Sequence, residues 1–358
     1  MSYYRVRGLI TTVLYSGARF LYNLLSMTLT EKIKQYALQL GFDLAGVTDA
    51  AIIDADNESY FQKWLLKGNA ASMDYLHKNL DKRFAPAKLL GNARSVIVTA
   101  LNYKPHPAKH VAAKSPTGKV AAYAQYEDYH TFIKNLLHKL GDFITENVDS
   151  KPAFKFCVDS VPLAERALAH RAGLGFVGKN HMLINPTQGA QLLLAEIITD
   201  LKLDIDQPYP KDILNSKLTT ENSKLILIAG EECKGCDKCI QACPTGALNA
   251  DGIFDANLCI SYLTQSNIPE IPKELAEKIG DKIFGCDNCT IACPYHRNAP
   301  VCRNSDFKFY PDRAQLNLSD ILNMTQEQFD EKFFDSPIRR VGLTNMKRNA
   351  NICLQNQP

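Results

Sequence analysis

The chain has 358 residues, of which 46% are hydrophobic and 22% are charged, and its formal net charge at neutral pH is +3. These values are ordinary for a soluble globular protein and leave room for two or three domains. The near balance of charge argues against a generally basic nucleic-acid-binding coat, although it allows a local basic patch. No apolar run approaches the ~20 residues that a membrane-spanning helix requires.

The first 26 residues differ in composition from the rest of the chain. They contain three arginines, no acidic residue and only a short apolar stretch, so a transit-like or signal-like peptide is one interpretation. We favour an added or mis-assigned extension before Met27, and a cytoplasmic protein. The reason is that a helix signal begins there: a threonine at position 28 or 30 can cap a helix through Glu31–Leu40, which Gly41 ends.

Helices and strands alternate from Met27 to about Leu201. Apolar periodicity and turn residues predict, in chain order, a short buried strand ending at Val47, helices at Tyr60–Leu66 and Met73–Leu80, a strand at Ser95–Leu101, a loop at Lys104–Lys119, a helix at Tyr129–Val148, a strand at Ala153–Val158, a helix at Val161–Ala172 and a strand at Gln191–Thr199. This alternation predicts an α/β layer protein built on a sheet.

The second half of the chain is organised differently. A connecting segment at Asp204–Ser223 has few periodic apolar residues, and a cysteine-rich module follows at Glu231–Asn298. The tail, Pro300–Pro358, is predicted to be mostly helical, with helices at Leu318–Leu322 and Gln326–Phe334. We therefore divide the chain into an N-terminal extension (1–26), an α/β domain (27–225), a cysteine module (226–300) and a helical C-terminal region (301–358).

The cysteine module contains two regularly spaced runs. The first is Cys233-x2-Cys236-x2-Cys239-x3-Cys243-Pro, the second is Cys286-x2-Cys289-x3-Cys293-Pro, and Cys259 stands alone between them. Eight thiolates are the number that two 4Fe-4S clusters need, because each cluster takes four. Zinc is the main alternative, but the first run has one more regularly spaced thiol than a zinc ribbon needs. Disulfides are disfavoured without a convincing secretory context.

The spacing also predicts which thiolates share a cluster. The cysteine that precedes proline normally reaches the other cluster in two-cluster ferredoxins. One cluster is then expected on Cys233, Cys236, Cys239 and Cys293, and the other on Cys243, Cys259, Cys286 and Cys289. The remaining thiols, Cys157, Cys302 and Cys353, are most simply buried or incidental.

Two motifs suggest cofactor sites but lack the required context. Gly173–Gly178 has the GxGxxG spacing of dinucleotide folds, but it follows a predicted helix rather than a strand. Its glycines more simply allow a backbone turn close to a bulky ligand or another strand. Asp128-Tyr129-His130 begins like a cobalt-ligating DxHxxG pattern, but Ile133 occupies the place of the glycine. We interpret His130 as a structural or hydrogen-bonding residue.

Asp159 follows the strand predicted at Ala153–Val158 and precedes the helix predicted at Val161–Ala172. An N-cap is the simplest role for a carboxylate at that place. However, ligands of α/β sheets gather outside the carboxyl ends of the strands, and Lys179 lies in the glycine-rich turn after that helix. A buried carboxyl with a raised pKa could deliver a proton during a reduction.

Several unrelated segments, in order, resemble the epoxyqueuosine reductases. They are VDSVPLAERALAHRAGLGFVGKNHMLINPTQGAQLLLAEI, GNAASMDYLHKNLDKRFAPAKLLGNARSVIV, YAQYEDYH, the cysteine runs and the tail SPIRRVGLTNMKRNANICL. The resemblance implies reduction of epoxyqueuosine to queuosine at the wobble position of tRNA, with cobalamin and two 4Fe-4S clusters. It implies an α+β protein with an α/β cobalamin-binding domain like that of reductive dehalogenases, a ferredoxin-like two-cluster module and a helical C-terminal region.

The resemblance also implies roles for individual residues. Asp159 matches the proposed proton donor, and Arg83 matches a candidate cobalamin contact. Other positions are expected near the corrin or substrate or along the pocket: Tyr123, Asp128, Tyr129, His130, Ser160, Lys179 and Asn180. The chain departs from the family pattern at two positions, with His181 in place of a small hydroxyl residue and Gln191 in place of an aromatic one, and we expect both to alter detailed contacts in the pocket.

The implied partners are tRNA carrying epoxyqueuosine in its anticodon loop and a low-potential electron-donor protein, and we expect a monomer. Residues 336–358 contain no acidic side chain, and their cations, Arg339, Arg340, Lys347 and Arg348, could contact phosphates; a solvated helix face with a mobile tail is the alternative. A reductive dehalogenase is a second candidate function, although Arg5 and Arg7 are not the adjacent pair of its usual export signal. An electron carrier is a third, and the long α/β domain argues against it.

Overall fold

The structure is a computed structural model that describes residues 27–106, 115–209, 233, 235–250 and 252–357. Its main sheet has the strand order β1-β2-β7-β4, formed by Leu44–Asp49, Ser95–Asn102, Leu192–Thr199 and Phe154–Cys157. The strands predicted in these regions are confirmed. Neighbouring strands are antiparallel throughout this sheet, so the expectation that ligands gather at the ends of parallel strands does not apply here.

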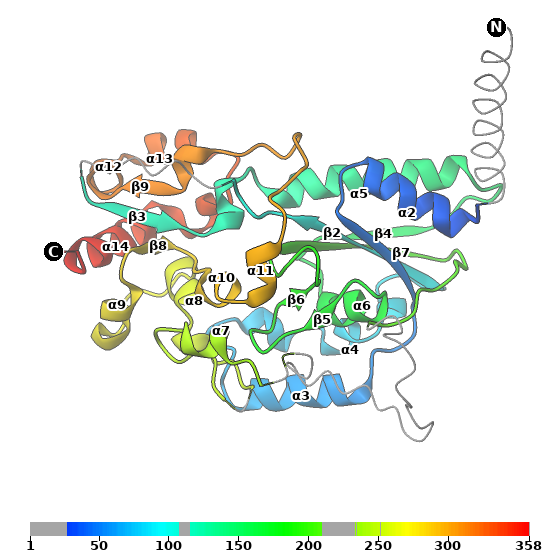
Figure 1. Ribbon diagram of the computed structural model, residues 1–358, viewed down its shortest axis with the longest axis horizontal. Coiled ribbons are helices and arrows are strands. Elements are labelled where there is room, and N and C mark those ends of the chain that lie inside the picture. Colours follow the sequence, from blue (N-terminus) through cyan, green and yellow to red (C-terminus); the bar gives the residue numbers. More distant parts are fainter. Residues whose placement is uncertain (1–26, 107–114, 210–232, 234, 251, 358) are drawn as a thin grey trace, which may run out of the picture.

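Helices cover both faces of the main sheet (Figure 1). Helices α2 (Leu29–Gln39) and α5 (Tyr129–Glu146) lie on one face, and α6 (Glu165–Arg171) lies on the other. The central strand β2 is buried along its whole length, and its side chains alternate between the faces as a strand's two-residue period requires. Ile97 belongs to the core under α2 and α5, whereas Val98 belongs to the core under α6.

Helix α2 begins where the sequence predicts. The Thr28 side chain accepts the backbone N–H of Glu31 at 3.3 Å, and the Glu31 carboxylate accepts the backbone N–H of Thr28 at 2.8 Å. This reciprocal capping box satisfies two N–H groups that a helix start leaves unpaired. Gly41 follows the helix at φ +95°, a conformation that favours glycine.

The other helices are mostly short. They are α3 (Ala55–Leu66), α4 (Leu80–Arg83), α7 (Lys238–Gln241), α8 (Ile260–Gln265), α9 (Lys273–Ile279), α10 (Asn288–Ile291), α11 (Pro294–Asn298), α12 (Leu318–Asn323), α13 (Gln326–Lys332) and α14 (Gly342–Gln355), with 3-10 helices at Asp74–His77, Pro86–Lys88, Ala122–Gln125, Ala256–Leu258, Pro311–Arg313 and Pro337–Val341. None of the described helices is both long and apolar enough to cross a membrane.

The prediction of a helix at Met73–Leu80 is wrong. The segment contains one 3-10 turn, Asp74–His77, and Asn79 then adopts a left-handed conformation with φ +53°. A residue in the left-handed conformation cannot continue a right-handed helix, so a new helix, α4, begins at Leu80. Apolar spacing could not reveal this break, because asparagine is one of the few residues that tolerate the conformation.

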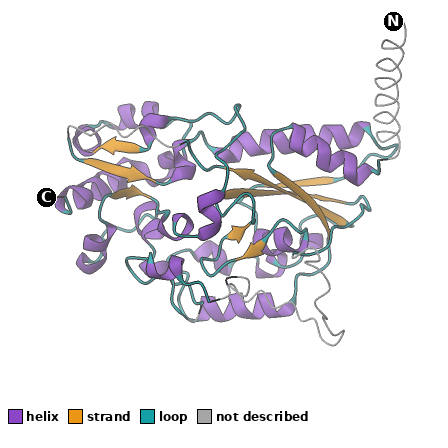
Figure 2. Ribbon diagram, viewed as in Figure 1, coloured by secondary structure: helices purple, strands orange, loops and turns teal. Residues whose placement is uncertain are grey.

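A second sheet joins segments that are far apart in the sequence (Figure 2). Strand β3 (Thr117–Val120) lies between β8 (Lys282–Phe284), to which it is parallel, and β9 (Gln315–Asn317), to which it is antiparallel. The α/β domain, the cysteine module and the C-terminal region predicted from the sequence each contribute one of these strands. Strand β9 was not predicted, since the tail was expected to be mostly helical.

The glycine-rich segment after α6 forms a hairpin, with β5 at Phe176–Val177 and β6 at Leu183–Ile184. A Cβ on Gly175 would lie 2.2 Å from the carbonyl oxygen of Ile184, and one on Gly178 would lie 2.3 Å from the Ile184 side chain. These glycines therefore let one strand approach another, which was one of the two interpretations favoured over a dinucleotide site.

Candidate active site

Asp159 lies on a tight turn directly after β4. Its φ is +52°, and the Ser160 N–H donates to the Val158 carbonyl at 2.5 Å across it. A three-residue turn with positive φ at its centre is rare and strained. Helix α6 begins only at Glu165, so the N-cap interpretation of Asp159 is wrong. Pro162 explains the late start, because the residue before a proline disfavours helical conformation.

Two side chains from the start of α5 bind the Asp159 carboxylate. The Tyr129 hydroxyl donates to its Oδ2 at 2.7 Å, and Nε2 of His130 lies 3.2 Å from the same oxygen. The hydrogen bond from His130, followed by that from Tyr129, lowers the pKa of Asp159 although partial burial opposes the shift. The expected raised pKa is therefore wrong: Asp159 is an ionised acceptor near neutral pH.

His130 connects two aspartates. Its Nδ1 lies 2.8 Å from Oδ1 of Asp128, the residue that caps α5. Burial alone would lower the pKa of His130, but hydrogen bonds to Asp128 and Asp159 outweigh it and raise the pKa. Arg340 completes the group, because its guanidinium donates to Asp128 at 2.7 Å and lies within 3.2 Å of both ring nitrogens of His130.

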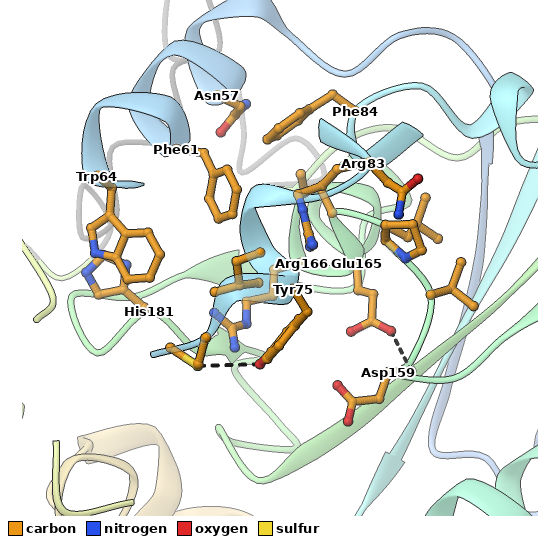
Figure 3. Close-up of a pocket in the computed structure, with 18 of the residues that line it drawn as sticks. Asn57, Phe61, Trp64, Tyr75, Arg83, Phe84, Asp159, Glu165, Arg166 and His181 are labelled. Atoms are coloured by element: carbon orange, nitrogen blue, oxygen red, sulfur yellow. Dashed lines mark hydrogen bonds between the residues drawn. The ribbon is translucent and has the colours of Figure 1, made fainter. Parts of the chain in front are cut away.

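A cavity of about 640 Å³ opens beside Asp159 (Figure 3). Aromatic side chains, among them Phe61, Trp64, Tyr75 and Phe254, line part of its wall. Charged side chains, Arg83, Asp159, Glu165 and Arg166, line another part. Within the described structure the Nε of Arg83 is buried without a hydrogen-bond partner, and its guanidinium lies 5.2 Å from the centre of the Phe61 ring.

Two further carboxyl groups lie behind Asp159. The Glu165 carboxyl accepts the Asp159 backbone N–H at 3.0 Å, and burial followed by the charge of Asp159 raises the pKa of Glu165 to about 7. Glu196, on β7, is fully buried, and neither carboxylate oxygen finds a hydrogen-bond partner in the part of the chain that the structure describes. Burial, then Glu165 and Asp159, raise the pKa of Glu196 far above its usual range.

The cysteines gather in the two predicted sets. Cys243, Cys259, Cys286 and Cys289 line one small cavity of about 50 Å³. Cys233, Cys236, Cys239 and Cys293 form a second neighbourhood, in which the thiols influence one another electrostatically. This grouping agrees with the exchange, between the two runs, of the cysteines that precede proline, which the ferredoxin spacing predicts; the assignment of each thiolate to a cluster stays a prediction.

The remaining predicted residues fall in different places. Ser160 lines the large cavity. The Tyr123 hydroxyl donates to Gln265, and its ring meets that of Tyr129 edge-on at 6.1 Å. Asn180 lines the small cavity and not the large one beside Asp159, and it donates to the Cys289 carbonyl at 3.3 Å. Lys179 is not among the residues that line either cavity.

Sequence reasoning missed several residues of this site. Nothing in the local sequence identifies Glu196 as a buried site residue, because a single acidic residue in an apolar strand is typical of a solvent-exposed position at the edge of a sheet. Phe254 comes from the cysteine module and lines both cavities. Arg340 was expected to contact phosphate, not Asp128 and His130. Only Glu165 had a usable signal, since it lies within the same short segment as Asp159.

The basic tail is more structured than either interpretation supposed. Arg348 donates to the backbone carbonyls of Leu263 and Ile268, and burial lowers its pKa. It therefore ties α14 to the end of α8 and is not free to bind phosphate. Helix α14 buries one side, including Met346, Ala350 and Cys353, against the rest of the fold, so this part of the tail is a packed helix with one solvated face.

Two family models match the chain. One, described as "Epoxyqueuosine reductase QueG, DUF1730", matches residues 83–160, a range that begins at Arg83 and ends at Ser160. The other, described as a 4Fe-4S double cluster binding domain, matches residues 232–296, which include all eight cysteines of the two sets. Fold, site and matches together define the class of protein, an α+β iron–sulfur oxidoreductase.

Relatives narrow this class to a family. The epoxyqueuosine reductases of Vibrio cholerae and Escherichia coli are each 34% identical to the chain; the alignments cover 92% of it, and 84% and 82% of those proteins. A solved epoxyqueuosine reductase from Streptococcus thermophilus matches with a TM-score of 0.77 at 30% identity, over 91% of this chain and 80% of that one. The chain belongs to the epoxyqueuosine reductase family, as its sequence motifs indicated.

One further solved structure bears on the substrate. It is an epoxyqueuosine reductase with an epoxyqueuosine-modified tRNA stem loop, and it matches with a TM-score of 0.76 at 31% identity, over 92% of this chain and 81% of that one. Reductive dehalogenase chains match only with TM-scores near 0.40 at 14% identity. The expected likeness of the α/β domain to that class therefore stays a prediction.

Proposed function

We propose that this protein reduces epoxyqueuosine in tRNA to queuosine, using cobalamin and two 4Fe-4S clusters. The observation that carries the proposal is the position of Asp159. Its carboxylate is bound by Tyr129 and His130 at the wall of the large cavity, and Phe254 lines both that cavity and the one among the second cysteine set. The names of the relatives and the tRNA stem loop bound to one of them support it.

The overall reaction sets what the site must supply. Removing the oxygen of an epoxide as water, with formation of a carbon–carbon double bond, consumes two electrons and two protons. Iron–sulfur clusters carry electrons singly, and the two cysteine sets are the groups we propose to hold them. We propose that a low-potential donor protein returns electrons to the clusters after each turnover. The monomeric state and the cytoplasmic location of the protein stay predictions.

The large cavity has features that suit a corrinoid. Its aromatic wall offers apolar surface to a flat macrocycle, and Arg83 presents a buried Nε that no described residue binds. Asn57, Tyr60 and Arg166 add polar groups at the wall. When bound, cobalamin would supply low-potential cobalt chemistry that side chains cannot provide.

The residues of the chain would manage the protons. His130 lies between Asp128 and Asp159, and its hydrogen bonds to these two carboxylates raise its pKa, so they favour its protonated form. Asp159 can take that proton and pass it to the departing oxygen, with Tyr129 holding the carboxylate in place. In the Bacillus subtilis relative a catalytic aspartate lies on a loop that can swing out of the active site. A strained turn at Asp159 is in keeping with such a loop.

A tRNA-binding surface would include the cations that remain exposed. The side chains of Arg339 and Arg340 are 54% and 52% exposed. Arg340 also contacts Asp128 and His130, so a phosphate or base near it would lie next to the proposed proton donor. Stacking of an extruded base on Tyr or His rings at this place would suit recognition of a single modified nucleotide.

The decisive test is anaerobic turnover. The holoprotein is incubated with epoxyqueuosine-containing tRNA, cobalamin and a reductant, and the nucleosides are analysed by mass spectrometry. We expect queuosine to form, with loss of one oxygen from the substrate. No queuosine from a preparation with full iron content and bound corrinoid would overturn the proposed function.

A further inference from the structure

The turn at Asp159 needs external support. A residue other than glycine in the left-handed region costs about 1–3 kcal/mol and persists only where surrounding contacts hold it. Tyr129 and His130 hold the side chain of Asp159, but both contacts act on the carboxylate and not on the backbone. The backbone of the turn has one hydrogen bond of its own, from the Ser160 N–H to the Val158 carbonyl, and this bond leaves the Asp159 N–H to be bound from outside the turn.

Glu165 supplies that contact. Its Oε1 accepts the backbone N–H of Asp159 at 3.0 Å, so a side chain at the start of α6 reaches back to the centre of the strained turn (Figure 3). The start of α6 is itself anchored, because the Ala164 N–H donates to the Arg83 carbonyl at 3.0 Å. The turn is thereby tied to a fixed helix end.

The surroundings of Glu165 keep its charge low. Asp159 faces it from the turn, Glu196 lies nearby on β7, and Arg83 and Arg166 lie on the other side. Glu196 is completely buried, and in the described structure no group bonds its oxygens. Burial makes a charge on either carboxyl costly and raises the pKa of Glu165 to about 7, so the neutral form of Glu165 is well populated near neutral pH.

We propose that Glu165 is a positioning residue that holds the Asp159 turn in its active conformation by accepting the Asp159 backbone N–H. This inference rests on the proposed function, in which Asp159 delivers the proton. It requires of position 165 an oxygen acceptor but no charge. Glutamine meets that requirement, whereas alanine and leucine do not.

The test compares Glu165→Gln with Glu165→Ala and Glu165→Leu in the anaerobic holoprotein with equal iron content. Hydrogen exchange is read at two amides that do not bond Glu165: that of Ser160, which bonds the Val158 carbonyl across the turn, and that of Leu163, which bonds the Val161 carbonyl just after it. We expect exchange at these amides to rise at least tenfold in the alanine and leucine variants and to stay within threefold of wild type in the glutamine variant. Glu196→Gln, which removes the neighbouring acid but not the contact, serves as the matched control and should leave exchange at the turn unchanged.

Turnover separates this inference from the proposed function. We expect the alanine variant to lose at least tenfold in kcat with KM for tRNA unchanged, and the glutamine variant to recover most of it. The inference would be overturned if amide exchange at the turn in both the alanine and leucine variants matched wild type. It would also be overturned if exchange in the glutamine variant were as fast as in the alanine variant. If the alanine and leucine variants show faster amide exchange at the turn but full turnover, the role of Glu165 in holding the turn is confirmed and the assignment of Asp159 as proton donor is overturned.

Discussion

Arg340, from the C-terminal part of the chain, donates to the carboxylate of Asp128 at the start of α5 at a distance of 2.7 Å. The two residues are 212 positions apart in the sequence. The contact joins the segment that we expect to meet tRNA to the pair of aspartates around His130. The positive charge of Arg340 therefore acts on the pKa of His130, which it lowers.

Replacing Arg340 tests this connection. Arg340 opposes protonation of His130, so Arg340→Gln should raise the pKa of His130 further. The raised pKa stabilises the fold fully below the unfolded value of 6.5, and this contribution is lost as pH rises through the folded pKa. Because its folded pKa is higher, the Arg340→Gln variant should retain this contribution of His130 to stability up to a higher pH than wild type. Since Arg340 is half exposed, the change in stability should stay within about 1 kcal/mol. NMR titration of the imidazole measures the shift, and Arg339→Gln is the control.

Asp159→Ala should keep clusters and corrinoid yet lose most turnover. Proton transfer by a positioned side chain contributes about a hundredfold to ten-thousandfold, so single-turnover rates should fall by that order. Asp159→Asn, which keeps the shape but cannot carry the proton, should fall similarly. Wild-type rates in either variant would refute the assigned role. Iron content and corrinoid absorbance establish that both variants are loaded.

Removal of Cys243 should affect the cluster held mainly by the second cysteine run. The Cys243 thiol lies with Cys259, Cys286 and Cys289 around one cavity, so Cys243→Ala should lower the iron content by up to about half. Electron paramagnetic resonance of the reduced protein should retain the signal of the other cluster. Cys353→Ala, a buried thiol outside both sets, is the control and should keep full iron. Unchanged iron in the Cys243 variant would contradict the exchanged ligand pattern.

The pKa of Glu165 predicts a pH-dependent stability. Because its folded pKa of about 7 lies above the reference value of 4.5, the folded state binds more protons between these values, and stability falls as pH rises through that window. Glu165→Gln removes this titration. Relative to wild type, the variant should therefore gain stability between pH 4.5 and 7 in chemical denaturation. If the free energy of unfolding changed with pH in the same way in wild type and in Glu165→Gln, the raised pKa of Glu165 would be contradicted.

Gly175 tests the structural interpretation of the glycine-rich segment. An added Cβ would lie 2.2 Å from the Ile184 carbonyl oxygen, so Gly175→Ala should destabilise the fold by about 1–3 kcal/mol. Gly91→Ala is the matched control, because no atom lies within 4 Å of the added carbon there, and its effect should stay below about 1 kcal/mol. Equal stability of the two variants would show that the hairpin can open to accept a side chain.

Much of the fold could be predicted because it depends on local patterns. The buried run at Ser95–Leu101 and the amphipathic stretch from Tyr129 onward identify β2 and α5 by their periodicity alone. The breaks were harder to see. Asn79 and Asp159 interrupt the regular structure with a positive φ, and such a strained conformation depends on tertiary contacts that stabilise it.

Cysteine spacing and motif order, read from the chain alone, indicated the family, which the relatives confirm, and predicted the two thiolate sets and the role of Asp159. Ligand spacing is a local property, because three sulfurs of one tight loop must face one cluster. Only the tertiary structure decided the protonation of the site. It surrounds Asp159 with Tyr129 and His130, which favour its charge, and buries Glu165 and Glu196, which disfavours theirs. Burial and proximity set these pKa values, and both arise only when distant segments pack together.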